Sequence, residues 1–124
     1  MDAIRDWWST LSIESMGLVG LVTPSIETVI DLKTGRIDHY TAGKMCMFRG
    51  EHCDFDPDDV NQGIWLITAG GPVGGTRVDT YGVLSPGEGS FLMPAGTTGS
   101  VTLRMVTFIN GSLRSTTYTT PLEP

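Results

Sequence analysis

The chain has 124 residues and a net charge of −6, with 40% hydrophobic and 18% charged residues. This length is typical of one domain, and the composition is too apolar for a disordered chain. The eight basic residues are scattered singly, which argues against nucleic-acid binding by this chain alone, because phosphate contacts require clustered Lys and Arg. No segment reaches the ~20 apolar residues of a membrane-spanning helix, so no membrane span is expected.

The first expected element is an amphipathic helix over residues 2–13. Its apolar side chains recur at the spacing i, i+3, i+4 and i+7. This stripe, our candidate interface, consists of Ile4, Trp7, Trp8 and Leu11. It could pack on the domain's own sheet or dock on a neighbouring subunit; a membrane surface is disfavoured because the polar face is not basic. Residues 1–24 are therefore interpreted as a helix with a linker, and residues 25–124 as the main domain.

From residue 27 onward the pattern is that of short strands separated by turn residues. The expected strands cover residues 27–32, 36–40, 44–48, 63–69, 76–84, 91–93, 101–109 and 112–119. About eight short strands predict an all-β protein, an antiparallel β-sandwich or jelly roll.

Two of the expected turns carry specific hairpin signals. Gly35 stands where the first hairpin needs a positive φ, and Asn110-Gly111 is the strongest short hairpin signal known. Folding the chain at Asn110-Gly111 sets Phe108 opposite Leu113.

The only two cysteines are Cys46 and Cys53. If Arg49-Gly50 forms a tight turn, they lie opposite each other on a hairpin and could form a disulfide. The alternative is a pair of reduced, partly buried thiols.

An acidic segment follows, and it is the most concentrated feature of the sequence. Calcium takes six to eight oxygen ligands, so this segment is a candidate calcium site, which a neighbouring subunit could share. Its carboxylates are Glu51, Asp54, Asp56, Asp58 and Asp59. An EF-hand is excluded, because Asp59 stands at the glycine position and Trp65 at the position of the bidentate Glu. A solvated loop with capped turns is the alternative.

Catalytic signals are missing from the sequence. The only histidines, His39 and His52, stand next to Asp38 and Cys53, and neighbours on one strand point to opposite faces. Adjacent His52 and Cys53 also make a zinc site improbable. We therefore expect no enzyme activity.

Three segments of the second half carry a resemblance to a known family. They are Gly63-Ile-Trp-Leu-Ile-Thr-Ala-Gly-Gly, Phe91-Leu-Met-Pro-Ala-Gly and Gly99-Ser-Val-Thr-Leu-Arg-Met-Val-Thr-Phe, followed by a Thr-Pro-Leu-Glu-Pro tail. They resemble capsid proteins of small icosahedral RNA viruses, of the nodavirus and tombusvirus kind. The resemblance implies a structural role in a virion, with the acidic segment as a calcium site at a subunit contact. A projecting domain fits better than a shell domain, because the chain is short and has no basic arm.

Two functional hypotheses follow. The first is a structural assembly module of a capsid or phage particle that self-associates into a homo-oligomer. The second is a β-sandwich that binds a carbohydrate or host receptor, with Tyr40, Trp65 or Tyr81 lining a shallow site.

Overall fold

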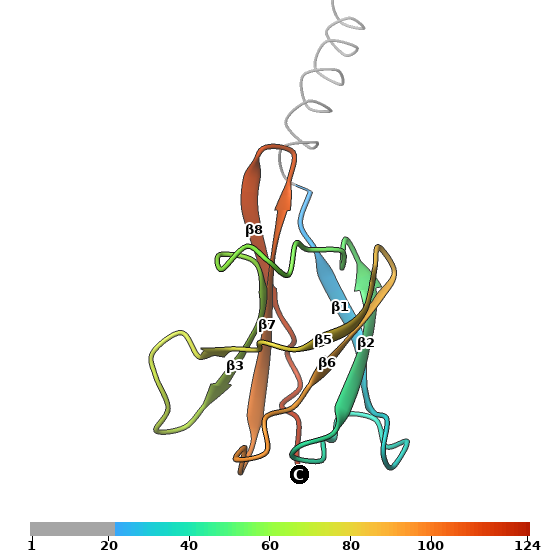
Figure 1. Ribbon diagram of the computed structural model, residues 1–124, viewed down its shortest axis with the longest axis vertical. Helices are drawn as coiled ribbons and strands as arrows, with labels where there is room; N and C mark the ends of the chain where they lie inside the picture. The colour runs from blue at the N-terminus through green and yellow to red at the C-terminus, as the bar shows by residue number, and fades with distance from the viewer. Residues whose placement is uncertain (1–21) are drawn as a thin grey trace, which may run out of the picture.

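The computed structural model describes residues 22–124, which form an antiparallel β-sandwich of eight strands (Figure 1). The strands are β1 (Ser25–Asp31), β2 (Met45–Glu51), β3 (Gly63–Thr68), β4 (Thr76–Arg77), β5 (Tyr81–Ser85), β6 (Glu88–Leu92), β7 (Val101–Ile109) and β8 (Ser112–Thr117). The first sheet has the order β1-β2-β6-β5, and the second sheet has the order β4-β3-β7-β8. The all-β prediction is confirmed. The expected helix with its interface residues Ile4, Trp7, Trp8 and Leu11 lies outside the described residues.

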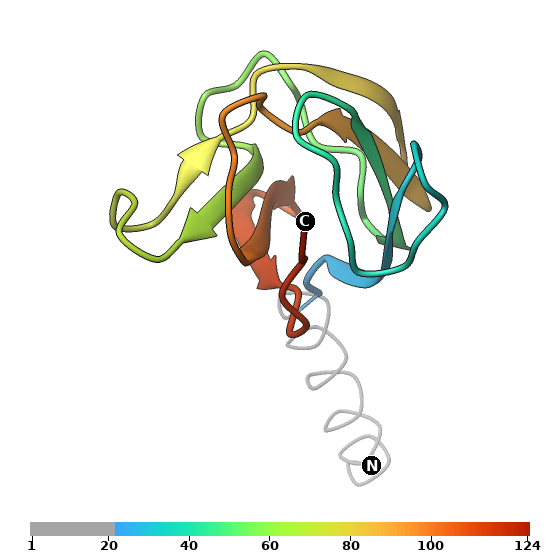
Figure 2. The ribbon, with the colours of Figure 1, turned by 90° about the horizontal axis from the view of Figure 1, so that it is seen from below.

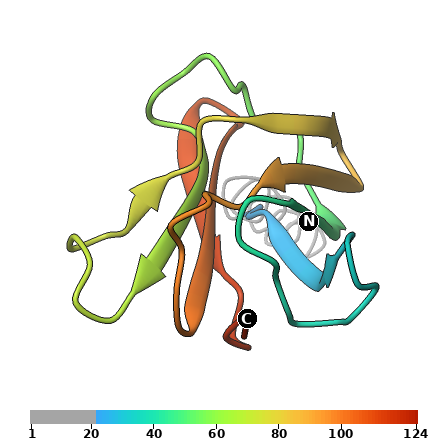
Figure 3. The same cartoon turned by 60° about the horizontal axis from the view of Figure 1, so that its bottom comes forward.

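The strand order is that of an immunoglobulin-type sandwich, which settles the choice left open between sandwich and jelly roll. The order β1-β2-β6-β5 corresponds to strands A-B-E-D of that fold, and β3-β7-β8 corresponds to strands C-F-G, with the short β4 added beside β3 as a C′ strand. Figures 2 and 3 show the two sheets facing each other, with the β3–β4 loop projecting away from both. The single strand expected over residues 76–84 is divided: β4 pairs with β3, and β5 pairs with β6 in the opposite sheet.

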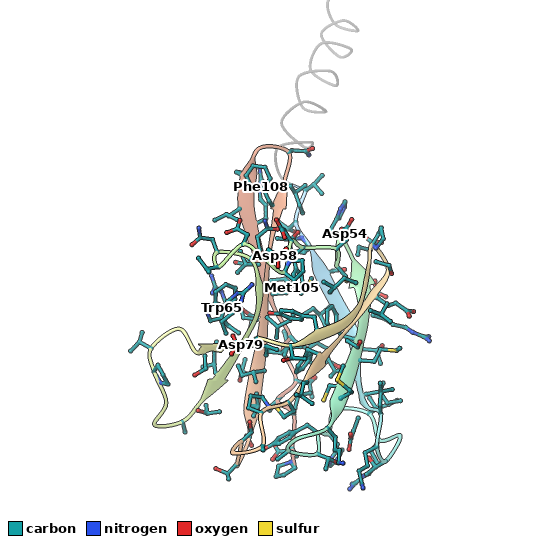
Figure 4. All side chains as sticks on the ribbon, in the orientation of Figure 1. Asp54, Asp58, Trp65, Asp79, Met105 and Phe108 are labelled. Carbon is teal, nitrogen blue, oxygen red and sulfur yellow. The ribbon has the colours of Figure 1, made fainter. Side chains whose placement is uncertain are left out.

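The core lies between the two sheets and is built by alternation along the strands. The first sheet contributes Val29, Phe48 and Phe91, all fully buried. The second sheet contributes Ile64, Leu103 and Met105, also fully buried; Met105 is labelled in Figure 4. Because alternate residues point outward, each sheet also presents an outer face to solvent.

The β7–β8 hairpin forms in the register that the sequence predicts. Phe108 pairs with Leu113, and the Tyr118 amide donates to the Leu103 carbonyl at 2.8 Å. Asn110 and Gly111 both have positive φ, 49° and 86°, as a type I′ turn requires.

The hairpin expected at residues 27–40 forms only in part. Gly35 has the expected positive φ of 77°, and one bridge joins Ile30 to Ile37. The chain then leaves the strand, and β1 pairs with β2 instead. The buried Asp31 carboxylate stabilises this loop, because it accepts hydrogen bonds from the Lys33 amide and from the hydroxyls of Thr34 and Thr41.

Of the two alternatives for the cysteines, the structure shows the reduced pair and not the disulfide: Cys46 and Cys53 are both buried and free. Arg49-Gly50 is not a turn; both residues lie inside β2 and pair with β1. Cys46 lies on β2 and Cys53 follows the end of that strand, so the two cysteines do not face each other across a hairpin. Burial raises the pKa of Cys46 to about 12 and that of Cys53 to about 11, so both thiols stay protonated at neutral pH.

Candidate functional site

The acidic segment forms the connection between β2 and β3, and turns within it engage the carboxylates of Asp56 and Asp59. Asp56 Oδ1 accepts from the Asp58 amide at 2.9 Å, and Asp59 Oδ1 accepts from the Asn61 amide at 2.9 Å. Hydrogen bonds from the Gln62 side chain and the Asn61 amide hold the pKa of Asp59 below its ordinary value. These are the local bonds by which Asp stabilises turns.

Arg77 on β4 is the cation that organises this connection. Its Nε donates to the Gln62 carbonyl at 2.7 Å, and its Nη2 donates to the carbonyls of Pro57 and Asp59 at 2.9 and 3.0 Å. The buried Gln62 side chain attaches the same segment to β7, because its Oε1 accepts from the Asp56 and Phe108 amides, each at 3.1 Å. The sequence does not indicate the contacts of Arg77, because it stands 15 or more residues away from Pro57, Asp59 and Gln62.

The predicted calcium ligands do not converge. Within residues 22–124, no three or more His, Cys, Asp or Glu side chains are grouped so that they could hold a metal ion. Asp54 and Asp58 are exposed and are labelled at separate positions in Figure 4. The alternative of a solvated loop with capped turns describes Glu51, Asp54, Asp56, Asp58 and Asp59 better, because backbone amides cap the carboxylates of Asp56 and Asp59, and Glu51, Asp54 and Asp58 are exposed to solvent.

The two histidines lie apart, on different loops. His39 is half-buried beside the C-terminal segment, where its backbone forms an isolated parallel β-bridge with Glu123. His52 is exposed just after β2, with a positive φ of 57°. The described region also contains no helix long and apolar enough to cross a membrane.

Of the three aromatic residues expected to line a ligand site, two have structural roles. Tyr40 is 2% exposed, and its hydroxyl donates to the Gly99 carbonyl at 2.7 Å. The Tyr81 hydroxyl accepts from the Ile64 amide at 3.0 Å, and its ring packs edge-on against Phe55. Trp65 remains half-exposed on β3, on the side of the second sheet away from the core.

Trp65 is the centre of a row of side chains across the outer face of the second sheet. It pairs with Arg77 on β4 and with Arg104 on β7. The guanidinium carbons of these arginines lie 5.9 and 5.7 Å from the Trp65 ring centroid, within cation–π distance. Beside the row is a hollow of about 350 Å³, open to solvent, which we call the Trp65–Arg104 hollow. It is lined by Asn61, Trp65, Val73, Gly74, Gly75, Arg104, Val106, Leu113, Arg114 and Ser115.

The outer face of the first sheet carries a different feature, an apolar groove of about 410 Å³. We call it the β1–β2 groove; it is lined by Thr28, Ile30, Leu32, Ile37, Met47 and Arg49. Leu32 is 49% exposed and Ile37 is 58% exposed, which is high for large apolar side chains. The alternation of Ile30 and Leu32 with buried Val29 and Asp31 is a signal that could have indicated this face from the sequence.

Comparison with known proteins gives a fold match and no family. No protein-family model and no curated protein matches the sequence. Among solved structures, the chain is similar to a candidate bacterial DNA-binding protein from Bacteroides vulgatus, with a TM-score of 0.65 and 24% identity. The match covers 80% of this chain and 47% of that one, so this chain spans about half the length of that protein. At this identity the likeness establishes the fold alone.

Proposed function

We propose that the chain is a non-catalytic assembly module that pairs with a second copy of itself through the β1–β2 groove. The observation that carries this proposal is the exposure of Leu32 and Ile37 beside Ile30 and Met47 on one sheet face. Apolar residues grouped in this way are typical of protein–protein contacts, whereas scattered ones are not.

The charges at the groove favour a second copy as the occupant. Arg49 lies at the groove and forms a loose ion pair with Glu88 of β6, at 3.9 Å. A two-fold axis next to this pair would place Arg49 of one copy near Glu88 of the other, so that the face is complementary to itself. Closed two-fold dimers are also the commonest form of soluble oligomer.

The test is the mass of the full chain in solution, measured by light scattering after size exclusion over a range of concentrations. We expect a dimer that the double variant Leu32→Glu, Ile37→Glu converts to a monomer, because both side chains are exposed and their replacement should leave the fold intact. Leu113→Glu is the matched control: Leu113 is 48% exposed but belongs to the second sheet. A chain that is monomeric throughout, or a dimer that only Leu113→Glu disrupts, would contradict the proposal.

This proposal is compatible with two larger settings. In a capsid, such a module would be a projecting domain, since the strand order differs from the jelly roll of capsid shells. In a longer protein such as the Bacteroides vulgatus one, it would bring the attached domains of two chains together. The net charge of −6 and the engagement of Arg77 in its own loop disfavour DNA contact by this chain itself.

The second candidate function is ligand binding at Trp65, and the Trp65–Arg104 hollow favours it. A carbohydrate usually needs an open aromatic face, but two guanidinium groups already contact the Trp65 ring. The chemistry of this hollow therefore favours an anionic ligand over a neutral sugar.

A further inference from the structure

The charge of the Trp65–Arg104 hollow is opposite to that of the whole chain. Two arginines, Arg104 and Arg114, line it, and no carboxylate does. The complete chain has a net charge of −6. Positive groups gathered in a hollow with apolar walls focus the local potential, so this is a place where an acidic protein can attract an anion.

The two arginines that contact Trp65 differ in what else they bind. Three hydrogen bonds to carbonyl oxygens hold Arg77 in the β2–β3 connection. Arg104 contacts the Trp65 ring, and the described residues offer its guanidinium neither a hydrogen-bond acceptor nor an acidic partner. The ring holds the Arg104 guanidinium at 5.7 Å from its centroid, and a guanidinium has five N–H donors that can bind a ligand.

The walls of the hollow add apolar surface beside this free guanidinium. Val106 and Leu113 contribute from β7 and β8, and Val73 contributes from the exposed tip of the β3–β4 loop. The Arg104 guanidinium can bind a carboxylate, and the aliphatic side chains beside it can contact an apolar side chain. A peptide with an acidic residue next to an apolar one offers both groups. Arginine binds a carboxylate through two parallel hydrogen bonds, which makes this contact both strong and directional.

We infer that the Trp65–Arg104 hollow binds an acidic peptide segment, with a Glu or Asp carboxylate on Arg104 and a neighbouring apolar side chain against Val106 and Leu113. A nucleic acid is a poorer match, because the hollow offers only two arginines within an acidic molecule, and binding to a phosphate chain requires several. The site is on the second sheet, so it does not depend on self-association through the first sheet.

The test uses the full ¹⁵N-labelled chain and the indole N–H signal of Trp65, which Trp65→Phe assigns among the three tryptophans. The probes are a capped hexapeptide with two glutamates between leucines, the same peptide with glutamines, inorganic phosphate and a short single-stranded oligonucleotide. We expect only the glutamate peptide to shift the signal to saturation, at concentrations up to about 10 mM, tenfold above a Kd of about 1 mM.

Two variants show whether Arg104 makes the contact. Arg104→Gln should weaken the binding of the glutamate peptide roughly tenfold to hundredfold, because a charged hydrogen-bonded pair is lost. Arg104→Lys should restore it only in part, since an ammonium cannot form the two parallel bonds. Arg36→Gln, which removes an exposed arginine outside the hollow, should leave binding unchanged.

Several results would overturn the inference. They are no shift with the glutamate peptide, an equal shift with the glutamine peptide, or equal weakening by Arg36→Gln. Equal binding of phosphate or the oligonucleotide would show a general anion site instead of a peptide site. A thermal melt of Arg104→Gln matching that of the original chain ensures that a loss of binding is not a loss of fold.

Discussion

At the scale of single residues, the cysteines and Arg77 show how far a side chain's role depends on its surroundings. Cys46 belongs to the core beside Val29 and Phe48 and acts as a small apolar residue. Arg77 stands 15 or more residues from the segment it contacts, yet it holds the β2–β3 connection through three carbonyl oxygens. Both roles are fixed by contacts between residues far apart in the chain.

The buried Cys46 thiol predicts a loss of stability in alkaline solution. Burial, followed by the charge of Asp31, raises its pKa from 9.0 to about 12. Above pH 9 the thiol ionises in the unfolded chain but not in the folded one, so unfolding releases a proton and stability falls as the pH rises towards 12. This contribution is up to about 1.4 kcal/mol per pH unit.

Urea unfolding at about pH 8 and about pH 10, with reductant present, measures this loss. Cys46→Ala should be less stable than the original chain at both values, because it leaves a small cavity. Its free energy of unfolding should nevertheless fall less between them. Equal losses in the two proteins would contradict the assignment of the pH dependence to Cys46.

At the scale of elements, the pairing of β1 with β2 depends on Gly50. A Cβ atom at this position would lie 1.9 Å from the Ser25 carbonyl oxygen, far inside van der Waals contact. The register of the two strands also shifts between Ile26 and Thr28, next to this approach. Glycine is therefore required at position 50 because the β1 backbone lies too close to leave room for a side chain. The sequence had suggested instead that Gly50 forms a turn.

Gly50→Ala should reduce the free energy of unfolding by about 1–3 kcal/mol or more, because the backbone of β1 must move away. The matched control is Gly87→Ala in the β5–β6 turn. A Cβ there meets nothing within 4 Å, and the Gly87 carbonyl accepts a hydrogen bond from the Gly50 amide. Thermal or urea unfolding of both variants is the measurement, and equal stabilities would refute the steric role of Gly50.

At the scale of the whole molecule, the C-terminal segment joins the two sheets. Leu122 is fully buried between them and exchanges backbone hydrogen bonds with Val101 of the second sheet. The next residue, Glu123, bonds through its backbone to Asp38 and Tyr40 in the loop after β1. In Figure 2 the C-terminus lies between the sheets at this end of the sandwich.

Leu122→Ala should therefore destabilise the entire domain in one cooperative transition, by about 2–5 kcal/mol. Val60→Ala, at an exposed position in the β2–β3 connection, should change stability by no more than about 0.5 kcal/mol. Calorimetry of the full chain tests this. A shallow first transition for Leu122→Ala, with the main transition unchanged, would show that the segment is dispensable to the sandwich.

The sequence by itself determined the features that depend on near neighbours along the chain. The all-β class, the approximate number of strands and the register of the β7–β8 hairpin follow from alternation and from the turn preferences of Asn and Gly, which act over a few residues. The hydrogen bond from the Tyr118 amide to the Leu103 carbonyl shows that the predicted register holds to the far end of the hairpin.

Only the tertiary structure decided which strands share a sheet and which side chains share a surface. Residues 76–84 continue one strand pattern, yet β4 pairs with β3 in one sheet and β5 pairs with β6 in the other. The acidic segment suggested calcium, but its Asp56 and Asp59 carboxylates cap local turns, and Arg77 holds the segment from another strand through backbone carbonyls. The Trp65–Arg104 hollow likewise combines side chains from β3, β7 and β8. These pairings depend on burial and on the close approach of distant segments, and no local pattern encodes them.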